Sequence, residues 1–388
     1  MTDAPTPNVF SILQSRQKDW QMALIAKRTY SLVPNKRCPL HDEQVPLVLE
    51  QTFDDRDVLV HDLDVVVVKE RTDVILKGAA HSHFDKPVTQ LDVGIEMAGQ
   101  SKMARVMGDR VCYYKNAEIA FSSPNGFTAM PLDYTRAYGG SDERARESLD
   151  VIRTVDLQTY TPHDLFFANL CIYPRNAVGK GYALARDDRL DEMPLPNVED
   201  VNDLLTPARL VVPDPKKWYL QPIPMGFDFY DYNWFPRSTH FGIKPGLYEI
   251  RRDELPKVHE IQKGYVTEED IFPPPSTLPM GFHFSDKYIN AASPGLSFPY
   301  LLGDEEIRLQ NMDREHPDFV FHLPDDRPRM TIRPLDEETV EVVPKLYTVI
   351  IEKEENLVSL VWGGVVKPRL PHGPDQLQKV EHTLSWKR

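Results

Sequence analysis

Apolar side chains recur at every second position in several parts of the chain, which is the period of a half-buried β-strand. Trp20, Met22, Leu24 and Ala26 alternate in this way and predict a strand over residues 20–32, although a helix also fits the first half. Alternation of Leu91, Val93, Ile95 and Met97 with polar or small residues predicts a second strand. Three β-branched runs of strand length add to the same signal: residues 58–60, 65–68 and 74–76.

Glycines and charged residues separate further strands. Residues 103–114 are broken by Gly108 and Asp109, as a hairpin turn would break them. After the turn at Gly303 and Asp304, Ile307 alternates with polar neighbours and predicts a strand. The last part of the chain holds short, evenly spaced apolar runs that are typical of a meander or half of a sandwich: residues 319–323, 330–332, 340–343, 346–351 and 357–366.

Three segments carry helix signals instead. Residues 141–153 begin with a serine N-cap followed by acidic residues, which predicts a helix. Residues 197–201 are expected to start a short helix, and residues 251–262 a short helix that a proline interrupts.

The middle of the chain is rich in proline and aromatic residues. The 34 prolines are nearly twice the number that an average usage of about 5% gives, so turns and irregular connections must be abundant. Residues 278–312 combine many aromatics with frequent Pro and Gly, which predicts a loop region that packs on its own side chains. Residues 224–229 and 279–284 share five of six positions; either an old duplication or a recurring way to enter a strand explains this echo.

These patterns predict a mainly β fold of antiparallel sheets, sandwich-like or meander-like, with long Pro- and aromatic-rich loops and a few short helices. We divide the chain into four parts. Residues 1–19 form an N-terminal arm, residues 20–160 a β-rich part, residues 161–312 a loop-rich part of the same unit, and residues 313–388 the C-terminal strands with a polar tail after Pro368.

Charge and cysteine content exclude several classes of protein. The formal net charge of -14, without a cluster of Lys and Arg, argues against nucleic-acid binding. No apolar run approaches the roughly 20 residues that cross a bilayer, so no membrane partner is expected. Cys38, Cys112 and Cys171 are widely spaced and odd in number, which fits free thiols in a reducing compartment. The N-terminus lacks signal-peptide features, and we therefore expect a cytoplasmic protein.

Candidate catalytic and metal-binding residues are few. On a strand, His81 and His83 would share one face near Asp85, but no third metal ligand is marked, and turn or surface histidines are the better interpretation. Asp109 beside Arg110 fits a local ion pair better than a catalytic carboxylate. Phosphate-loop and nucleophile-elbow spacings are missing from the sequence, so we predict no catalytic, cofactor or metal residues.

The aromatic cluster of residues 218–241 has two interpretations. As an interior it explains how a proline-rich region stays folded, and we favour this for most of it, because so many exposed aromatics would aggregate. As a surface it offers residue types that dominate protein interfaces. On that second hypothesis the candidate partner-binding residues are Trp234, Arg237, Phe227 and Phe282.

Several short motifs also follow one another in a definite order. They begin with Gly108-Asp109-Arg110 and end with Leu302-Gly303-Asp304-Glu305 followed by Leu309 and Asn311. Between them come Met130-Pro131-Leu132, Arg136-Ala137-Tyr138-Gly139-Gly140, Asn176-Ala177-Val178-Gly179-Lys180-Gly181-Tyr182, Leu195-Pro196-Asn197 with Glu199, Trp234-Phe235-Pro236-Arg237 and Asn290-Ala291-Ala292.

Over residues 20–312 this succession resembles a family of bacterial proteins, first catalogued as a domain of unknown function, whose genes lie beside spike and effector genes in type VI secretion clusters. The chain resembles a divergent member. The family usually has Trp near Tyr134 and Phe at Tyr138, and its Pro-rich turn after the Asn-Ala-Ala motif is replaced here by residues 293–296.

The resemblance implies a non-enzymatic adaptor or chaperone that loads a secreted effector, often one with a PAAR-like tip domain, onto the VgrG spike. The expected partners are therefore the effector and, as a second candidate, the spike. Two hypotheses compete with it. One is a β-scaffold hydrolase or metal enzyme, which needs His81, His83 and Asp109 to meet in one pocket. The other is a structural protein that stays in the exported spike and is secreted with it.

Overall fold

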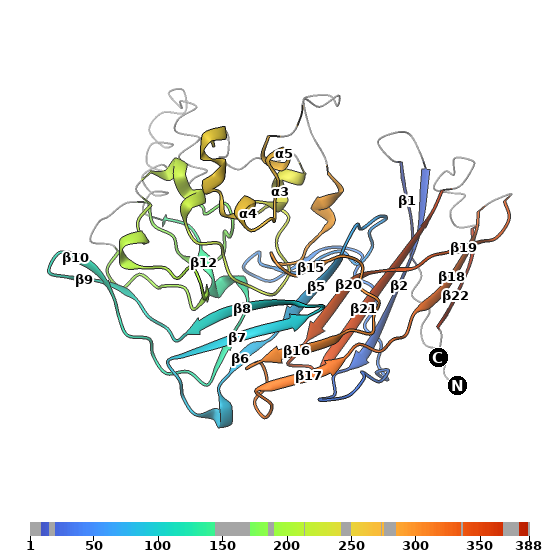
Figure 1. The fold of residues 1–388 in the computed structure, drawn as a ribbon, viewed down its shortest axis with the longest axis horizontal. Coiled ribbons are helices and arrows are strands. Elements are labelled where there is room, and N and C mark those ends of the chain that lie inside the picture. The colour runs from blue at the N-terminus through green and yellow to red at the C-terminus, as the bar shows by residue number, and fades with distance from the viewer. Residues whose placement is uncertain are drawn as a thin grey trace.

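Two sheets of mostly antiparallel strands form the body of the protein (Figure 1). The computed structural model describes residues 9–14, 20–143, 171–184, 190–212, 214–241, 250–272, 274, 285–334, 337–367 and 380–386. The six-stranded sheet has the order β1 (Val9–Gln14), β2 (Trp20–Ser31), β21 (Leu357–Val366), β20 (Lys345–Glu352), β5 (Thr72–Lys77), β15 (Ser297–Phe298). Its only parallel pair is β20 with β5. The five-stranded, fully antiparallel sheet has the order β14 (Val198–Asp200), β8 (Gln100–Met107), β7 (Gln90–Met97), β16 (Glu306–Gln310), β17 (Asp318–His322).

The main hydrophobic core lies between these two sheets. It takes Met22 and Leu360 from the six-stranded sheet and Ile95, Leu309 and Phe321 from the other, all at 2% exposure or less. Side chains two apart on a strand share a face, which is why the alternation in the sequence identified these strands. The predicted mainly β fold of antiparallel sheets with a few short helices is confirmed.

The six-stranded sheet is buried on its other face as well. There Ile25, Ile75, Ile350 and Val361 pack against Phe229 and partners from irregular segments. A sheet covered on both faces needs apolar side chains at successive positions, and this explains the continuous apolar runs of β20 and β21.

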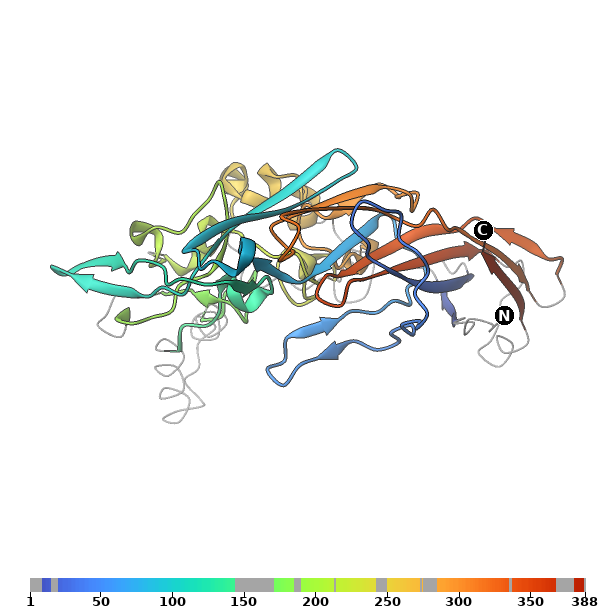
Figure 2. The same cartoon turned by 90° about the horizontal axis from the view of Figure 1, so that it is seen from below.

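Smaller elements complete the fold. A three-stranded sheet of β19 (Val340–Val342), β18 (Pro328–Arg333) and β22 (Glu381–Trp386) lies at one end of the molecule, and the loop-rich part, green to yellow, lies at the other (Figures 1 and 2). Four two-stranded sheets pair β3 (Thr52–Phe53) with β4 (Leu59–His61), β6 (Ala79–His81) with β11 (Ala129–Pro131), β9 (Cys112–Lys115) with β10 (Glu118–Phe121), and β12 (Tyr138–Gly139) with β13 (Lys180–Gly181).

All described helices are short. The α-helices are α3 (Arg237–His240), α4 (His259–Gln262) and α5 (Glu268–Ile271), and the 3-10 helices are η1 (His83–Asp85), η2 (Tyr134–Arg136), η4 (Pro207–Arg209), η5 (Pro215–Leu220), η6 (Arg252–Lys257) and η8 (Asp286–Ile289). The proline-interrupted helix predicted over residues 251–262 is confirmed as η6, with Pro256 inside it, followed by α4. None of the helices in the described ranges is both long and apolar enough to span a bilayer.

A second core holds the loop-rich part together. It is built largely of aromatic rings, among them Tyr138, Tyr173, Trp218 and Phe235, which meet edge to face with centroids 5.1–6.1 Å apart. Buried beside them, Arg175 forms an ion pair with Glu260 and donates to the backbone carbonyl oxygens of Tyr219 and Gln221. The favoured interpretation of residues 218–241 as mostly interior is thereby confirmed.

Five predictions from the sequence need correction. Residues 9–14 of the expected loose arm form β1, and part of the expected polar tail forms β22, which pairs antiparallel with β18. The apolar run of residues 65–68 is not a strand but covers the outer face of the six-stranded sheet. Residues 103–114 do not form a hairpin, because β8 pairs with β7 and β14 while β9 pairs with β10. Residues 198–200 form strand β14 rather than the start of a helix.

Two further predictions fall on residues outside the described ranges. They are the helix of residues 141–153 from residue 144 onward, and the second hexapeptide copy at residues 279–284. Three of the four parts of the sequence are interleaved in space, since the five-stranded sheet takes strands from residues 20–160, 161–312 and 313–388.

Candidate binding surface

A hairpin of residues 49–63, built on β3 and β4, projects from the body of the protein (blue in Figure 2) and is here called the exposed hairpin. Its two strands pair with each other and with no other described strand. Asp54 shapes the turn: its Oδ1 atom accepts hydrogen bonds from the backbone N–H groups of Arg56 and Val58, each at 2.9 Å. The tip, residues 54–57, carries three aspartates and one arginine.

Large apolar side chains gather on the exposed hairpin. Leu49 is 57% exposed, Phe53 42%, Val60 40% and Leu63 40%, and these are four of the twelve large hydrophobic residues exposed in the described chain. Single exposed apolar residues are ordinary, whereas a group on one projecting element is typical of an interaction site.

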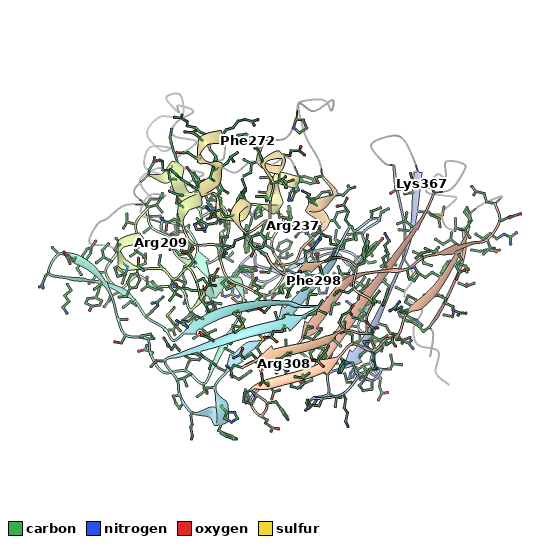
Figure 3. The ribbon with its side chains drawn as sticks, in the orientation of Figure 1. Arg209, Arg237, Phe272, Phe298, Arg308 and Lys367 are labelled. Atoms are coloured by element: carbon green, nitrogen blue, oxygen red, sulfur yellow. The ribbon has the colours of Figure 1, made fainter. Side chains whose placement is uncertain are left out.

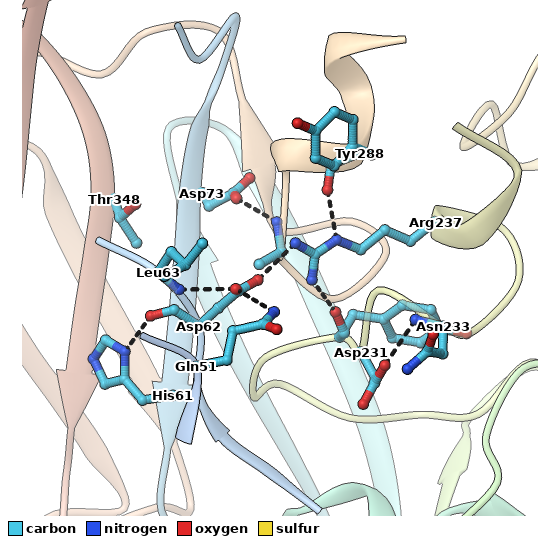
Figure 4. Close-up of polar contacts among 12 residues, drawn as sticks. Gln51, His61, Asp62, Leu63, Asp73, Asp231, Asn233, Arg237, Tyr288 and Thr348 are labelled. Atoms are coloured by element: carbon cyan, nitrogen blue, oxygen red, sulfur yellow. Dashed lines mark hydrogen bonds and ion pairs between the residues drawn. The ribbon is translucent and has the colours of Figure 1, made fainter. Parts of the chain in front are cut away.

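A buried ion pair fixes the base of the exposed hairpin (Figure 4). Arg237, from α3, donates from Nη2 to Oδ2 of Asp62 at 2.6 Å, and each side chain is 7% exposed. Oδ1 of Asp62 accepts from Nε2 of Gln51 and from the Leu63 backbone N–H, both at 2.8 Å, so Asp62 ties both legs together. Burial alone would raise the pKa of Asp62, but the Arg237 charge and these hydrogen bonds outweigh it, and the pKa lies below its ordinary value.

A second buried ion pair holds the stem to the six-stranded sheet. Nζ of Lys27, on β2, lies 2.9 Å from Oδ2 of Asp64, with side chains 1% and 2% exposed. The same Oδ2 atom accepts from the backbone N–H of Val48 at 2.8 Å, and the backbone N–H of Asp64 donates to the Val48 carbonyl at 3.0 Å. The hairpin is therefore ordered before any partner arrives, which lowers the entropy cost of binding.

The structure changes the role of the partner-binding residues proposed from the sequence. Phe227 is 0% exposed in the main core, and Trp234 packs edge to face on Tyr134 and Tyr230 with centroids 5.3 Å away. Arg237 lies inside the molecule, where the loop-rich part meets the sheets (Figure 3). These three are interior residues rather than surface contacts, and Phe282 lies outside the described residues.

Sequence analysis did not single out the apolar side chains of the exposed hairpin. Two short apolar segments on either side of the charged residues 54–57 were the available signal. What the sequence did indicate was Arg237, which anchors this hairpin from inside.

His81 and His83 do not share a strand face. β6 ends at His81, and His83 begins η1 and is exposed; its ring is tilted against that of Phe84, with the ring centroids 3.8 Å apart. Nε2 of the buried His81 lies 2.8 Å from Oε1 of Glu354. The described residues contain no group of three or more His, Cys, Asp or Glu side chains placed to hold a metal ion.

Asp109 lies in a different place, among the sequence motifs. Its Oδ1 accepts from Nδ2 of Asn197 at 3.0 Å and forms ion pairs with Arg136 at 3.4 Å and Lys180 at 3.8 Å. Two cavities are lined by His81, and neither His83 nor Asp109 lines either of them. These three residues therefore do not meet in one pocket, as the hydrolase hypothesis requires.

Close backbone packing explains why several motifs carry glycine and asparagine. The side-chain amide of Asn176 donates to the carbonyl oxygens of Tyr134 and Tyr138 at 2.8 and 3.1 Å. Gly139 has a φ of 151° and passes so close to the Asn176 backbone that a Cβ would overlap it. These motifs thus join the loop-rich part to the sheets.

A strongly acidic cavity of about 460 Å³ adjoins His81. The pKa of Asp228 in its wall is raised to about 7, mainly by burial and to a smaller extent by the charges of Asp133 and Glu352, while Lys77 and the hydrogen bond from the Phe229 backbone oppose the increase. The folded protein therefore holds a proton on Asp228 that the unfolded chain releases at lower pH.

The Asp228→Asn variant tests this proton directly. Because the folded pKa is raised, the stability contributed by Asp228 is full at low pH and is lost as pH rises from about 4 to about 7. Each unit of pKa difference corresponds to about 1.4 kcal/mol, so we expect the wild type to lose at least about 1 kcal/mol more than Asp228→Asn over this range. Urea unfolding at several pH values measures it, with the exposed Asp318→Asn as control; parallel curves for wild type and Asp228→Asn would contradict the assignment.

Comparison with known proteins identifies one family. The model of the family described as "Uncharacterized protein conserved in bacteria (DUF2169)" matches residues 17–363, a range that includes the exposed hairpin and its anchors. No curated protein and no solved structure matches the chain.

Proposed function

We propose, from the premise that the chain belongs to the DUF2169 family of uncharacterized bacterial proteins, that it is a cytoplasmic, non-enzymatic adaptor or chaperone for a secreted effector. The effector would be a type VI secretion substrate that the adaptor helps load onto the VgrG and PAAR spike, as the ordered sequence motifs imply. Support for the type VI part of the proposal rests on that resemblance.

The observation that carries the binding role is the exposed hairpin. It carries four exposed apolar side chains, Leu49, Phe53, Val60 and Leu63, beside an acidic tip. Apolar and aromatic side chains at the centre of a contact, with charged groups at the rim, are the composition of protein interfaces. A partner that buries these side chains would supply its own apolar surface and basic groups to face the tip.

Loading requires release as well as binding. The hairpin would cover an apolar or unstable region of the effector, and contacts with the spike would replace the adaptor when the complex assembles. An exchange of this kind needs no catalytic centre.

A pull-down of the tagged full-length protein from its native bacterium, read by mass spectrometry at low salt, tests the proposal. We expect recovery of one effector encoded beside the adaptor gene, with or without the spike. If no secretion component is recovered under conditions that preserve weak complexes, the adaptor proposal is wrong.

A further inference from the structure

The six-stranded sheet ends in a strand with one unoccupied edge. β1 pairs with β2 and with no other strand or isolated bridge of the described chain, so one side of its backbone lies at the margin of the sheet (Figure 1). The strand has six residues, whereas β15 at the opposite margin has two. A long free edge presents N–H and C=O groups that another strand can bind.

Both margins of the five-stranded sheet are covered, in contrast to β1. Residues 35–38 run along β17, where the backbone N–H groups of Asn35 and Cys38 donate to the carbonyl oxygens of Val320 and His322 at 2.6 and 2.9 Å. At the opposite margin, residue 137 forms a parallel bridge with residue 198 of β14. The chain thus covers its longer sheet margins elsewhere, and no described residue does the same for β1.

The sequence of β1 lacks the residues that usually protect an edge. Its six residues, VFSILQ, include four apolar ones and no proline or charged residue. Natural edge strands commonly carry lysine or proline, which discourage pairing with another chain. β22, a margin strand of the same length, begins with the charged Glu381. Because a net charge of -14 keeps copies of this protein apart in general, contact between copies needs an uncharged strand of this kind.

Hydrogen bonds of β2 show which of its residues point toward β1. On the side of β2 away from β21, the N–H of Ser31 donates to the Pro39 carbonyl at 2.9 Å, and the Thr29 carbonyl accepts from His41 at 3.1 Å. Successive residues of a strand direct these groups to opposite sides. The odd-numbered residues of β2 therefore direct their N–H and C=O groups to this side, which is the side of β1.

The outward groups of β1 follow from its register with β2. Odd-numbered residues of the two strands are paired, and they exchange the hydrogen bonds that join them: Val9 with Ile25, Ser11 with Ala23 and Leu13 with Gln21. The even-numbered residues of β1 then direct their N–H and C=O groups away from the sheet. These residues are Phe10, Ile12 and Gln14.

The outward groups are symmetric about Ile12. When a second β1 lies antiparallel with residue 12 opposite residue 12, Phe10 of each copy lies opposite Gln14 of the other. Residues opposite each other in this way exchange both hydrogen bonds, so every outward N–H and C=O group of both strands is paired. Identical contacts on both sides of a two-fold axis also close the assembly at two copies.

We infer that the protein forms a homodimer in which β1 pairs antiparallel with β1 of a second copy, across a two-fold axis at Ile12. The two six-stranded sheets then form one continuous sheet of twelve strands. A second copy is the occupant that matches this edge in length, in the spacing of its backbone groups and in its lack of charge. The inference goes beyond the proposed function and does not depend on it.

The molar mass of the full-length protein in solution tests the inference. Sedimentation velocity at micromolar concentration should give about 89 kDa, twice the 44.6 kDa of one chain. Ile12→Pro removes the outward N–H and leaves the β1–β2 ladder intact, so it should raise the dissociation constant of the dimer at least about tenfold. Ile12→Ala is the matched control, because it shortens the side chain but keeps the N–H, and it should remain dimeric.

Unchanged far-UV circular dichroism shows that both variants are folded. A monomeric wild type overturns the inference, and so does a dimer that Ile12→Pro weakens no more than Ile12→Ala.

A cysteine at position 12 tests the register independently. In the inferred pair the two Cα atoms of residue 12 are about 5.5 Å apart, within reach of a disulfide. We expect Ile12→Cys to form a disulfide-linked dimer on mild oxidation. Ser11→Cys should do so at least about tenfold less, because its counterpart in the second copy lies two residues along the ladder. The native cysteines are buried, so the wild type gives the background. Equal cross-linking of the two variants would contradict the register.

Capture of the effector distinguishes self-pairing from pairing with a strand of the effector. If Ile12→Pro is monomeric and still captures the effector, β1 joins two copies of this chain and the exposed hairpin binds the partner. If the wild type is monomeric and Ile12→Pro, but not Ile12→Ala, loses the effector, β1 binds a strand of the effector and the homodimer is wrong. A dimeric wild type that captures no effector leaves this inference standing and overturns the proposed function alone.

Discussion

Replacing Arg237 with alanine is expected to lower the free energy of unfolding by about 3–5 kcal/mol, the usual cost of removing one partner of a buried ion pair. The guanidinium donates from Nε to the Tyr288 carbonyl at 2.7 Å, from Nη1 to the Tyr230 carbonyl at 2.6 Å and from Nη2 to Asp62 at 2.6 Å. Its loss leaves the Asp62 carboxylate buried with only Gln51 and a backbone N–H to stabilise it. Urea-induced unfolding followed by circular dichroism measures the change.

The matched control is Arg308→Ala. Arg308 lies on an exposed strand face (Figure 3), and its carboxylate partners are 3.8 Å away, so we expect a change of no more than about 1 kcal/mol. A loss in Arg237→Ala as small as that of the control would show that the network of Figure 4 does not hold the hairpin to the loop-rich part.

The double variant Phe53→Asp, Val60→Asp is expected to weaken binding of the effector at least 30-fold, equivalent to about 2 kcal/mol. Two carboxylates placed at these exposed apolar positions of the hairpin would have to be buried without partners on binding. Neither side chain belongs to a described hydrophobic core, so the free energy of unfolding should change by less than about 1 kcal/mol. Titration calorimetry with the purified effector measures the affinity.

A second double variant shows whether position matters or only added charge. Leu302→Asp, Val343→Asp changes two apolar residues outside the exposed hairpin that are 54% and 76% exposed, more than Phe53 and Val60. It should bind the effector like the wild type. Equal weakening by both double variants would place the interface elsewhere or make it a general effect of charge.

The strands could be predicted where a local pattern decides the outcome. β5, β7, β20 and β21 follow from period-2 or continuous apolar runs, because those side chains face one core or two. The same reasoning failed at residues 65–68, where the apolar side chains cover a sheet without joining it. Burial was predictable there, but backbone pairing was not.

Long-range contacts decided the elements that were missed. Residues 198–200 extend as β14 because Glu199 pairs with Arg110 and Asn197 donates to the Met107 carbonyl and to Asp109, groups about 90 positions earlier in the chain. β22 exists because β18 offers it a free edge. No local propensity contains such information.

For the candidate site, too, local patterns could be recognised in the sequence and long-range contacts could not. Aromatic residues and Arg237 in the proline-rich region could be recognised as important by type, and the interior interpretation of most of them was correct. The structural role of Arg237 could not be predicted from the sequence, because its ion-pair partner is Asp62, 175 positions away.

The most direct test of the central claim is the export of the effector in the native bacterium after deletion of this gene. The account predicts that export of the cognate effector is lost while spike assembly and export of other effectors continue. The intact gene should restore export, and the gene with Phe53→Asp, Val60→Asp should not. The adaptor itself should stay in the cell. Normal export in the deletion strain, or recovery of this protein in the exported spike fraction, would contradict the account.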